Sequence, residues 1–186
     1  MNFPILSSLI LLPTIGALFL LFSKDKNSNT GKYVALFTSF VNFLISIYLW
    51  YLFDPSTSTF QFVENREWLK GFVNYKVGID GISILFIILT TLITPLCIIS
   101  VNNTIKVRLR DFLIAILVME SLMIGVFCSL DLVVFYLFFE AGLIPMFLII
   151  GIWGGARRVY SAFKFFLYTL LGSVLMLDRK SVVERV

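Results

Sequence analysis

Two glutamates stand inside long apolar segments of the sequence, where an ionisable side chain is costly. Glu140 lies in the apolar run from Leu132 to Trp153, and Glu120 lies in the preceding apolar run. Counted at about 1.5 Å per residue, Glu140 is roughly 12 Å into a helix that crosses a hydrocarbon layer about 30 Å thick. A carboxylate at that depth costs about 2.5–3.5 kcal/mol on insertion scales. Two such acids in consecutive segments therefore indicate a pathway for charge or protons.

Pro145 follows Glu140 within the same apolar run. Inside a helix, a proline removes one backbone hydrogen bond and usually produces a kink. The freed carbonyl near position 141 can hold water close to the acid, which favours a functional role for Glu140. The alternative is a neutral, hydrogen-bonded Glu140 that only holds helices together. For Glu120 the alternative is a contact between helices, made through Ser121 or a threonine.

Lys164 lies about one turn into the last apolar segment. From there its side chain can extend to the membrane surface, or it can act as a proton relay or as a modulator of Glu140. Asp80 and Asp131 stand at the starts of apolar segments. We expect these two acids to interact with helix N-termini rather than to bind ligands.

The composition places most of the chain in lipid. Of 186 residues, 59% are hydrophobic and only 14% are charged, which is too few charges to cover a soluble domain. The net charge of +4 comes from basic residues in short loops, so no nucleic-acid partner is expected. The sequence has no histidine and only two cysteines, Cys97 and Cys128, in separate apolar runs. The usual ligands of iron–sulfur, haem and zinc sites are missing, so we expect no redox centre and no bound cofactor in this chain.

Six apolar segments predict an all-α, polytopic membrane protein with about six transmembrane helices. The first is too long for the apolar core of a signal peptide and is expected to be retained. The predicted spans are Phe3–Phe22, Lys32–Phe53, Asp80–Val101, Phe112–Ser129, Leu132–Trp153 and Ser161–Leu177.

Basic residues in the loops predict the orientation of the spans. The odd-numbered loops carry Lys24 and Lys26, then Lys106, Arg108 and Arg110, then Arg157 and Arg158. Because such loops stay on the cytoplasmic or matrix side, the N-terminus is expected to face the periplasm or its mitochondrial equivalent. The lipid bilayer is thus one partner of the chain.

The second loop, residues 54–79, is the one sizeable segment outside the apolar runs. Residues 60–64 and 75–77 alternate apolar and polar side chains at the period of a strand, which predicts a small hairpin at the membrane surface. Trp68, Phe72 and Tyr75 would suit the headgroup level. An unstructured loop is the alternative. Residues 178–186 follow the sixth span without a cap or turn residue, and we expect the span to stop there and the tail to be non-native.

Three stretches carry a resemblance to a known family. They are Val77 to Ser83 (VGIDGIS), Met119 to Phe127 (MESLMIGVF), and Asp131 to Gly155, which ends in IWGG. With these residues the chain resembles subunit M of bacterial NADH–quinone oxidoreductase, the equivalent of mitochondrial NADH dehydrogenase subunit four. The resemblance covers essentially residues 1–177.

The resemblance implies a truncated, antiporter-like, proton-pumping subunit in the membrane arm of respiratory complex I. It assigns residues 1–111 to three N-terminal helices and residues 112–177 to the start of the translocating repeat. In the family, Glu140 pairs with a lysine on the seventh helix, which lies beyond this chain, and Glu120 is also important. NADH, FMN, iron–sulfur clusters and quinone belong to the parent complex, and neighbouring antiporter-like subunits are the implied partners. The implied location is the bacterial inner membrane or, as the alternative, the mitochondrial inner membrane.

Three other functions remain open at this point. They are a subunit of a multi-subunit cation/proton antiporter, a subunit of an energy-converting hydrogenase, and a membrane scaffold without transport activity. A scaffold predicts that replacing Glu140 with Gln leaves proton transport unchanged.

Overall fold

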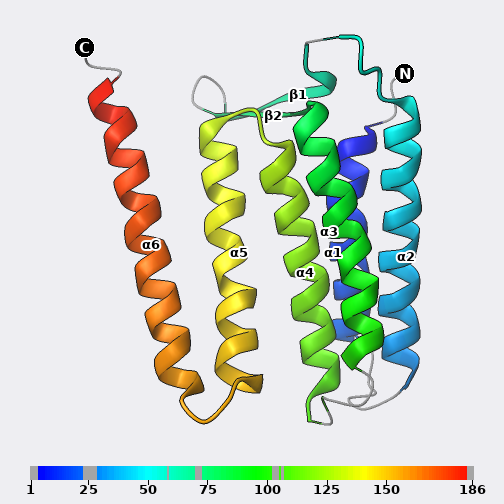
Figure 1. The fold of residues 1–186 in the computed structure, drawn as a ribbon, viewed down its shortest axis with the longest axis vertical. Coiled ribbons are helices and arrows are strands. Elements are labelled where there is room, and N and C mark those ends of the chain that lie inside the picture. The colour runs from blue at the N-terminus through cyan, green and yellow to red at the C-terminus, as the bar shows by residue number, and fades with distance from the viewer. Residues whose placement is uncertain are drawn as a thin grey trace.

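Four long helices form a cluster, two more extend from one side of it, and a two-stranded sheet lies across one end (Figure 1). The structure, a computed structural model, describes residues 4–22, 29–57, 59–69, 73–101, 105 and 107–183, without the side chains of 29, 66–69, 73–74 and 177–183. Within these ranges six helices are long and apolar enough to cross a membrane, so the predicted all-α polytopic fold is confirmed. The helices are α1 (Ile5–Phe22), α2 (Asn29–Leu52), α3 (Gly81–Ser100), α4 (Leu109–Cys128), α5 (Leu132–Trp153) and α6 (Arg158–Val183).

The helix bounds agree closely with the predicted spans except at the end of α6. The bounds of α5 match the prediction, and α4 begins three residues earlier than expected, at Leu109 instead of Phe112. The membrane-spanning part of α6, Arg158–Met176, ends close to the predicted limit at Leu177, but the helix itself continues to Val183. Residues 178–183 contain neither Gly nor Pro, so the helix extends beyond its apolar part. Residues 184–186 lie outside the described part of the chain, and the non-native origin of the tail stays a prediction.

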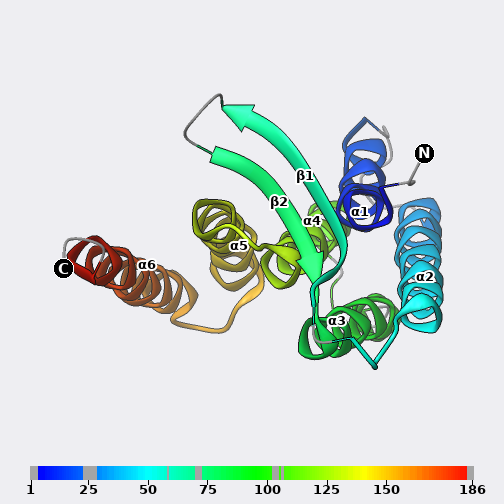
Figure 2. The same ribbon diagram turned by 90° about the horizontal axis from the view of Figure 1, so that it is seen from above.

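The predicted hairpin is present in the second loop. Strands β1 (Gln61–Leu69) and β2 (Val73–Ile79) pair antiparallel, with Gln61 opposite Ile79. The register shifts between Gln61 and Glu64, where Phe62 takes a left-handed backbone conformation with φ of 53°. Seen from above, the two strands cross α4 and pass beside α1 and α5 (Figure 2). Their position at a membrane surface stays a prediction, and the side chains of Trp68 and Phe72 lie outside what is described.

Two contacts fasten the hairpin to the helices. The Leu130 backbone N–H, in the turn between α4 and α5, donates to the Lys76 carbonyl at 3.0 Å. Gly78 permits this approach, because a Cβ there would lie 2.7 Å from Leu130 Cδ1. On the other strand, Glu64 Oε1 accepts from the Leu6 N–H at 2.9 Å, and Glu64 also accepts from Ser7. Glu64 therefore caps the N-terminus of α1, although it comes from a distant part of the chain.

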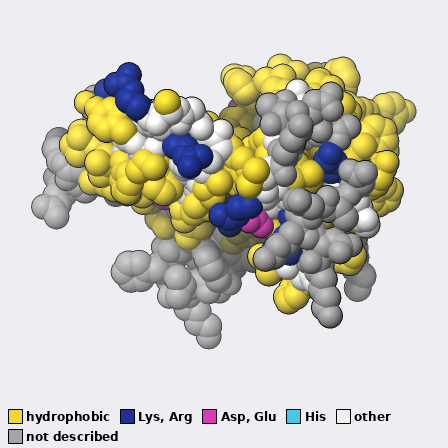
Figure 3. Space-filling model, turned by 90° about the horizontal axis from the view of Figure 1, so that it is seen from below, with side chains coloured by type: hydrophobic (Ala, Val, Ile, Leu, Met, Phe, Trp, Pro, Cys, Tyr) yellow, Lys and Arg dark blue, Asp and Glu magenta, His cyan; other side chains and the backbone are white. Residues whose placement is uncertain are grey.

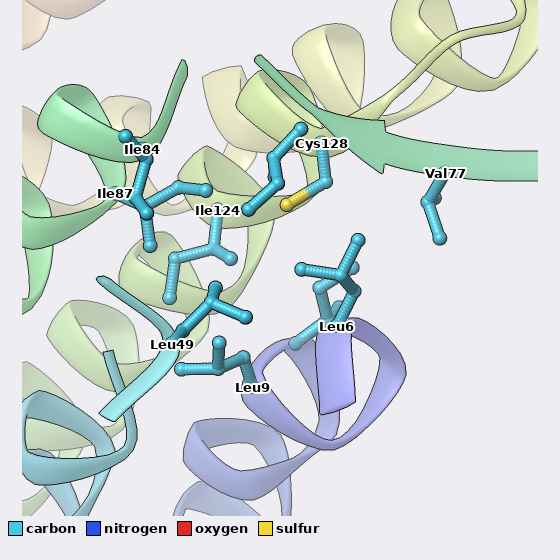
Figure 4. Close-up of a cluster of buried hydrophobic side chains, with 10 residues drawn as sticks. Leu6, Leu9, Leu49, Val77, Ile84, Ile87, Ile124 and Cys128 are labelled. Atoms are coloured by element: carbon cyan, nitrogen blue, oxygen red, sulfur yellow. The ribbon is translucent and has the colours of Figure 1, made fainter. Parts of the chain in front are cut away.

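The core of the bundle consists of two apolar clusters at different heights. The hairpin-side cluster packs α1, α2, α3 and α4 under the sheet (Figure 4). Its members are Leu6, Leu9, Ile10, Leu49, Val77, Ile79, Ile84, Ile87, Ile124 and Cys128. The loop-side cluster joins the same four helices near their other ends, and includes Leu20, Ala35, Ile98, Leu113 and Leu117. The hairpin closes the first cluster, since Val77 and Ile79 are fully buried in it.

The end opposite the hairpin carries the described loop arginines. Arg108 and Arg110 lie at the start of α4, Arg157 lies between α5 and α6, and Arg158 is the first residue of α6. Seen from this end, basic side chains are set into a surface that is otherwise largely hydrophobic (Figure 3). Lys24, Lys26 and Lys106, on which the predicted orientation also depends, lie outside the described residues. Which end faces the cytoplasm stays a prediction.

Candidate functional site

Glu120 and Glu140 lie at the same height on two neighbouring helices. Glu120 is eight residues before the end of α4 at Cys128, and Glu140 is eight residues after the start of α5 at Leu132. Because the two helices run in opposite directions, both acids are about 12 Å below the hairpin end. The sequence-based prediction that both acids fall at a similar depth is therefore met by the helix geometry.

Glu120 is almost completely enclosed by protein, with 2% of its surface exposed. Asn42 Nδ2, on α2, donates to Glu120 Oε1 at 2.9 Å. The second carboxyl oxygen, Oε2, and the Asn42 carbonyl oxygen are buried, and neither has a hydrogen-bond partner among the described residues. An unpaired polar atom in such a place costs about 1–3 kcal/mol, so Glu120 is under-satisfied. A water molecule at Oε2 would relieve this cost.

A polar face of α2 supports Glu120. Ser39, Asn42 and Ser46 recur at helical spacing and are each fully buried, although the helix is otherwise apolar. The Ser46 hydroxyl lies 2.8 Å from the Thr91 hydroxyl of α3. The same α2 face therefore binds both α3 and α4 through polar contacts.

Glu140 is half-buried and pairs with the last helix. Ser173 Oγ, on α6, donates to Glu140 Oε1. Ser173 itself is 7% exposed. Pro145 lies inside α5, which the structure describes as one helix from Leu132 to Trp153. Whether Pro145 kinks the helix stays a prediction.

The two acids point to opposite sides of the molecule. The partner of Glu120 belongs to α2, and the partner of Glu140 belongs to α6. Helices α2 and α6 lie at opposite ends of the molecule (Figure 2). A direct hydrogen bond between the two carboxyl groups is not present in the described structure. Any exchange between them would therefore need an intermediate carrier.

Lys164 is separated from Glu140 along the helix. It lies nine residues before Ser173 on α6, which corresponds to about 13 Å along the axis. Its side chain is exposed, and its Nζ lies 6.0 Å from the centre of the Tyr160 ring and 5.9 Å from that of Tyr168. The structure does not bring Lys164 to Glu140, and its role as a relay stays a prediction.

The two aspartates at span starts behave as predicted. Asp80 caps α3 by accepting from the Ser83 N–H at 2.7 Å, and Asp131 caps α5 by accepting from Val133 and Val134. The side chain and backbone of Ser83 hold the pKa of Asp80 below its usual value. Both are structural charges at helix N-termini.

The cysteines, the only Cys or His residues in the sequence, lie on separate helices. Cys97 is exposed on α3 and Cys128 is buried at the end of α4. Across the residues that the structure describes, no group of three or more His, Cys, Asp or Glu gathers to hold a metal ion. The prediction that this chain binds no cofactor stays a prediction.

Sequence reasoning missed the partners of the two acids. Asn42 is separated from Glu120 by 78 positions, and Ser173 is separated from Glu140 by 33. The signal for Asn42 was the regular spacing of Ser39, Asn42 and Ser46 in an apolar span. No comparable pattern singles out Ser173.

Comparisons with known proteins relate this chain to proteins of known name. The chain is 60% identical over 153 residues to the NADH-quinone oxidoreductase subunit M of Rhodobacter capsulatus, an alignment that covers 82% of this chain and 29% of the relative. The chain is homologous to subunit M. It is also 47% identical over 174 residues to NADH-ubiquinone oxidoreductase chain 4 of Marchantia polymorpha, which covers 92% of this chain and 35% of the relative. Subunit M of Rickettsia prowazekii is 47% identical over 181 residues, with 95% of this chain and 37% of the relative covered.

A family model matches part of the second half of the chain. Residues 129–178 match the family described as NADH:quinone oxidoreductase/Mrp antiporter, TM. This match contains α5, with Glu140, and most of α6. It overlaps the predicted repeat at 112–177, while the boundary at 111 stays a prediction. The chain spans about a third of the length of the subunit M and chain 4 relatives that it matches.

Proposed function

We propose that this chain is part of a membrane-arm subunit of an NADH:quinone oxidoreductase and carries protons through Glu120 and Glu140. The observation that carries the proposal is the pair of carboxyl groups held at one height on α4 and α5, with Glu120 buried and under-satisfied. The names of the subunit M and chain 4 relatives support the parent complex. The proposed location is a bacterial inner membrane or a mitochondrial inner membrane.

The energetic argument requires groups like these within the membrane. Moving one proton against a potential of 100 mV costs about 2.3 kcal/mol, so a pump needs intermediate sites that load and release protons. Glu120 would exchange its proton at Oε2, the oxygen without a described partner, while Asn42 holds Oε1 in place. Glu140 would exchange its proton beside the Ser173 hydroxyl. Lys164 remains a secondary candidate.

Electron transfer belongs to other parts of the proposed complex. Because the sequence has no histidine and only two cysteines, the proposal assigns NADH, FMN, iron–sulfur clusters and quinone to other subunits. The proposed partners are the neighbouring antiporter-like membrane subunits. Redox energy would reach this chain through them.

Substitution of the two acids tests the proposal in the complete subunit, assembled in its complex. We expect Glu140→Gln and Glu140→Ala to abolish or sharply reduce NADH-driven proton translocation while the complex still assembles. We expect Glu120→Gln to have a partial effect. Acidification of inverted membrane vesicles measures translocation, and NADH oxidation with an artificial acceptor checks assembly. Normal pumping by Glu140→Ala would refute the role of that residue.

A subunit of a cation/proton antiporter is the second candidate, because the matching family also includes Mrp antiporters. Sodium-dependent proton exchange in vesicles that lack NADH would favour this candidate. The oxidoreductase is preferred because relatives with up to 60% identity carry that name. A scaffold without transport activity predicts that both acid substitutions leave proton movement unchanged.

A further inference from the structure

Asn42 and Glu120 contact each other through one nitrogen and one oxygen atom only. Asn42 Nδ2 donates to Glu120 Oε1 at 2.9 Å, and both side chains are at most 2% exposed. The remaining oxygen of each group, Asn42 Oδ1 and Glu120 Oε2, is buried and has no hydrogen-bond partner among the described residues. While Glu120 is ionised, both of these atoms are acceptors, so neither can satisfy the other.

The buried serines that flank this pair have no hydrogen atom to spare. Ser39 and Ser46, about one turn on either side of Asn42, donate to carbonyls of their own helix at 3.1 and 2.7 Å. Ser121, next to Glu120, donates to a carbonyl of α1. Because a hydroxyl group carries a single hydrogen atom, all three are already used as donors. The surroundings of the pair are therefore rich in acceptors and lack a donor.

Ionisable side chains do not supply this donor in the described structure. Those on the helices and the hairpin strand that pack against α4 are Lys32, Tyr33, Tyr48 and Tyr51 of α2, Cys97 of α3, Tyr136 and Glu140 of α5, and Tyr75 and Lys76 of β2. Lys32 lies ten residues before Asn42, about 15 Å along α2, and Glu140 pairs with α6. Glu120 Oε2 has no described partner, so none of these side chains donates to it.

We propose that Asn42 is a positioning residue for both protonation states of Glu120. Its Nδ2 holds the ionised carboxylate, and its Oδ1 accepts from Oε2 once the carboxyl group carries a proton. A hydronium ion gives up the proton and becomes water as the O–H bond forms at Oε2; release reverses this step, and no electron is transferred. The inference deepens the proposed function and rests on it only for the use of Glu120 in transport.

A side-chain amide suits this role because its planar end carries a donor and an acceptor but no charge. In the ionised state, one contact is made and two acceptors are left over. In the protonated state, the same N–H···O contact is kept and a second hydrogen bond joins the two oxygens that were left over. Asn42 is fully buried, so its amide cannot turn to solvent instead. One residue can thus hold Glu120 in both states without movement of the helices.

Infrared difference spectroscopy tests the pairing in the complete subunit, assembled in its complex, as the pH is changed. We expect protonation of Glu120 to produce an acid carbonyl band and to move the Asn42 amide carbonyl band to lower wavenumber. Asparagine labelled with ¹³C at its side-chain carbonyl identifies the amide band. We expect Glu120→Gln to remove both changes. Asn42→Leu should remove the amide change and move the acid band to higher wavenumber, because the acid loses its partner.

Ser39→Ala is the matched control for Asn42→Leu. Ser39 lies on the same face of α2 and is also fully buried, but its hydroxyl donates to its own helix. We expect both infrared changes to persist in this variant. If Asn42→Leu does not assemble, Asn42→Ser replaces it, because a serine hydroxyl there would bond to its own helix as those of Ser39 and Ser46 do. The amide change should be lost in Asn42→Ser as well.

Two spectroscopic results would overturn the proposal. The first is an acid band assigned to Glu120 that appears without a change in the amide band, since Oδ1 would then already have a donor such as a water molecule. The second is the absence of any acid band that Glu120→Gln removes, at every pH at which the complex stays assembled.

Proton transport supplies the second readout. We expect Asn42→Leu to lower NADH-driven pumping toward the level of Glu120→Gln, and the double variant to pump no less than Glu120→Gln alone, because Asn42 acts through Glu120. Normal pumping by Asn42→Leu, or a further fall in the double variant, would overturn the positioning role. If the infrared changes appear but Glu120→Gln pumps normally, the pairing stands and the proton role of Glu120 is refuted. If Glu120→Gln impairs pumping but the amide band never moves, the pairing fails and the proposed function survives.

Discussion

The spacing between α4 and α5 depends on Gly125, and this makes a measurable prediction. A Cβ at Gly125 would lie 2.6 Å from Cδ1 of Phe138, and 2.7 and 2.8 Å from two other ring atoms. Ordinary contacts of this kind are 3.4–4 Å, so alanine forces the ring or the helix to move by close to an ångström. Gly125 lies five residues after Glu120 and Phe138 lies two before Glu140, so the contact fixes how the two acids are placed.

Gly142 is the matched control on α5. A Cβ at this position meets no described atom within 4 Å. Replacing glycine with alanine inside a helix raises the free energy of unfolding by about 0.5–1 kcal/mol, and we expect this increase for Gly142→Ala. Gly125→Ala has the same stabilising effect, but overpacking against Phe138 lowers the free energy of unfolding by about 1–3 kcal/mol. The free energies of unfolding of the two variants should therefore differ by about 1–3 kcal/mol. In a chain of this length, each kcal/mol shifts the unfolding midpoint by about 2–4 °C.

The buried thiol of Cys128 reports the unfolding. In a Cys97→Ser background, Cys128 is the one remaining thiol, and a dye that fluoresces on reaction with thiols follows its exposure as the protein is heated in detergent. Phe138→Leu should remove part of the clash, so the double variant Gly125→Ala/Phe138→Leu should be more stable than the sum of the single effects. Equal unfolding midpoints for Gly125→Ala and Gly142→Ala would refute the reasoning.

Three further predictions concern polar contacts; the first two are measured by the free energy of unfolding and the third by hydrogen exchange. Asn42→Leu should lower the free energy of unfolding by about 1–3 kcal/mol, because it leaves Glu120 without its partner. In a double-mutant cycle, Asn42→Leu/Glu120→Met should lose less stability than Asn42→Leu alone. Asp80→Ala should cost about 0.5–2 kcal/mol, whereas Asp80→Ser should cost less. Folding lowers the pKa of Asp80, so its contribution to the free energy of unfolding is present above the unfolded pKa of about 3.9. This contribution is lost as the pH falls through the lower pKa of the folded state. If Asp80→Ala loses as much stability over this pH range as the unsubstituted chain, the cap does not act as argued. Glu64→Ala should speed hydrogen exchange of the first amides of α1 by about tenfold, for a cap worth about 1 kcal/mol or more, and unchanged exchange would contradict the cap.

Local patterns predicted the helices and their caps well. The bounds of α5 follow from a run of apolar residues between Asp131 and Gly154, and both ends carry ordinary helix signals. The strand period at 60–64 was enough to locate the hairpin. By contrast, the length of α6 beyond its apolar part was not predicted, because apolar composition indicates where a helix leaves the membrane, while backbone hydrogen bonds decide where the helix ends.

The partners of the acids required the three-dimensional arrangement. Apolar periodicity identified Glu120 and Glu140 as anomalies, but it contains no information on which helix each one faces. The pairing of Glu120 with α2 arises because α4 lies centrally in the bundle, in contact with α1, α2, α3 and α5. Lys164 could likewise be named from sequence as a modulator of Glu140, although on α6 it lies about 13 Å along the axis from Ser173, the residue that contacts Glu140.

The contacts between the hairpin and the α4–α5 turn also constrain the order in which parts of the chain can pack during synthesis. Strand β2 leaves the ribosome before Ser129 and Leu130, the residues of the α4–α5 turn that it contacts. The contact can form only after α4 has crossed the membrane and delivered its C-terminal end to the compartment that already holds the hairpin. A copy with α4 inserted in the opposite direction would lack Ile124 and Cys128 in the cluster that buries Val77 and Ile79. Complete burial of the sheet thus depends on the direction in which α4 crosses the membrane.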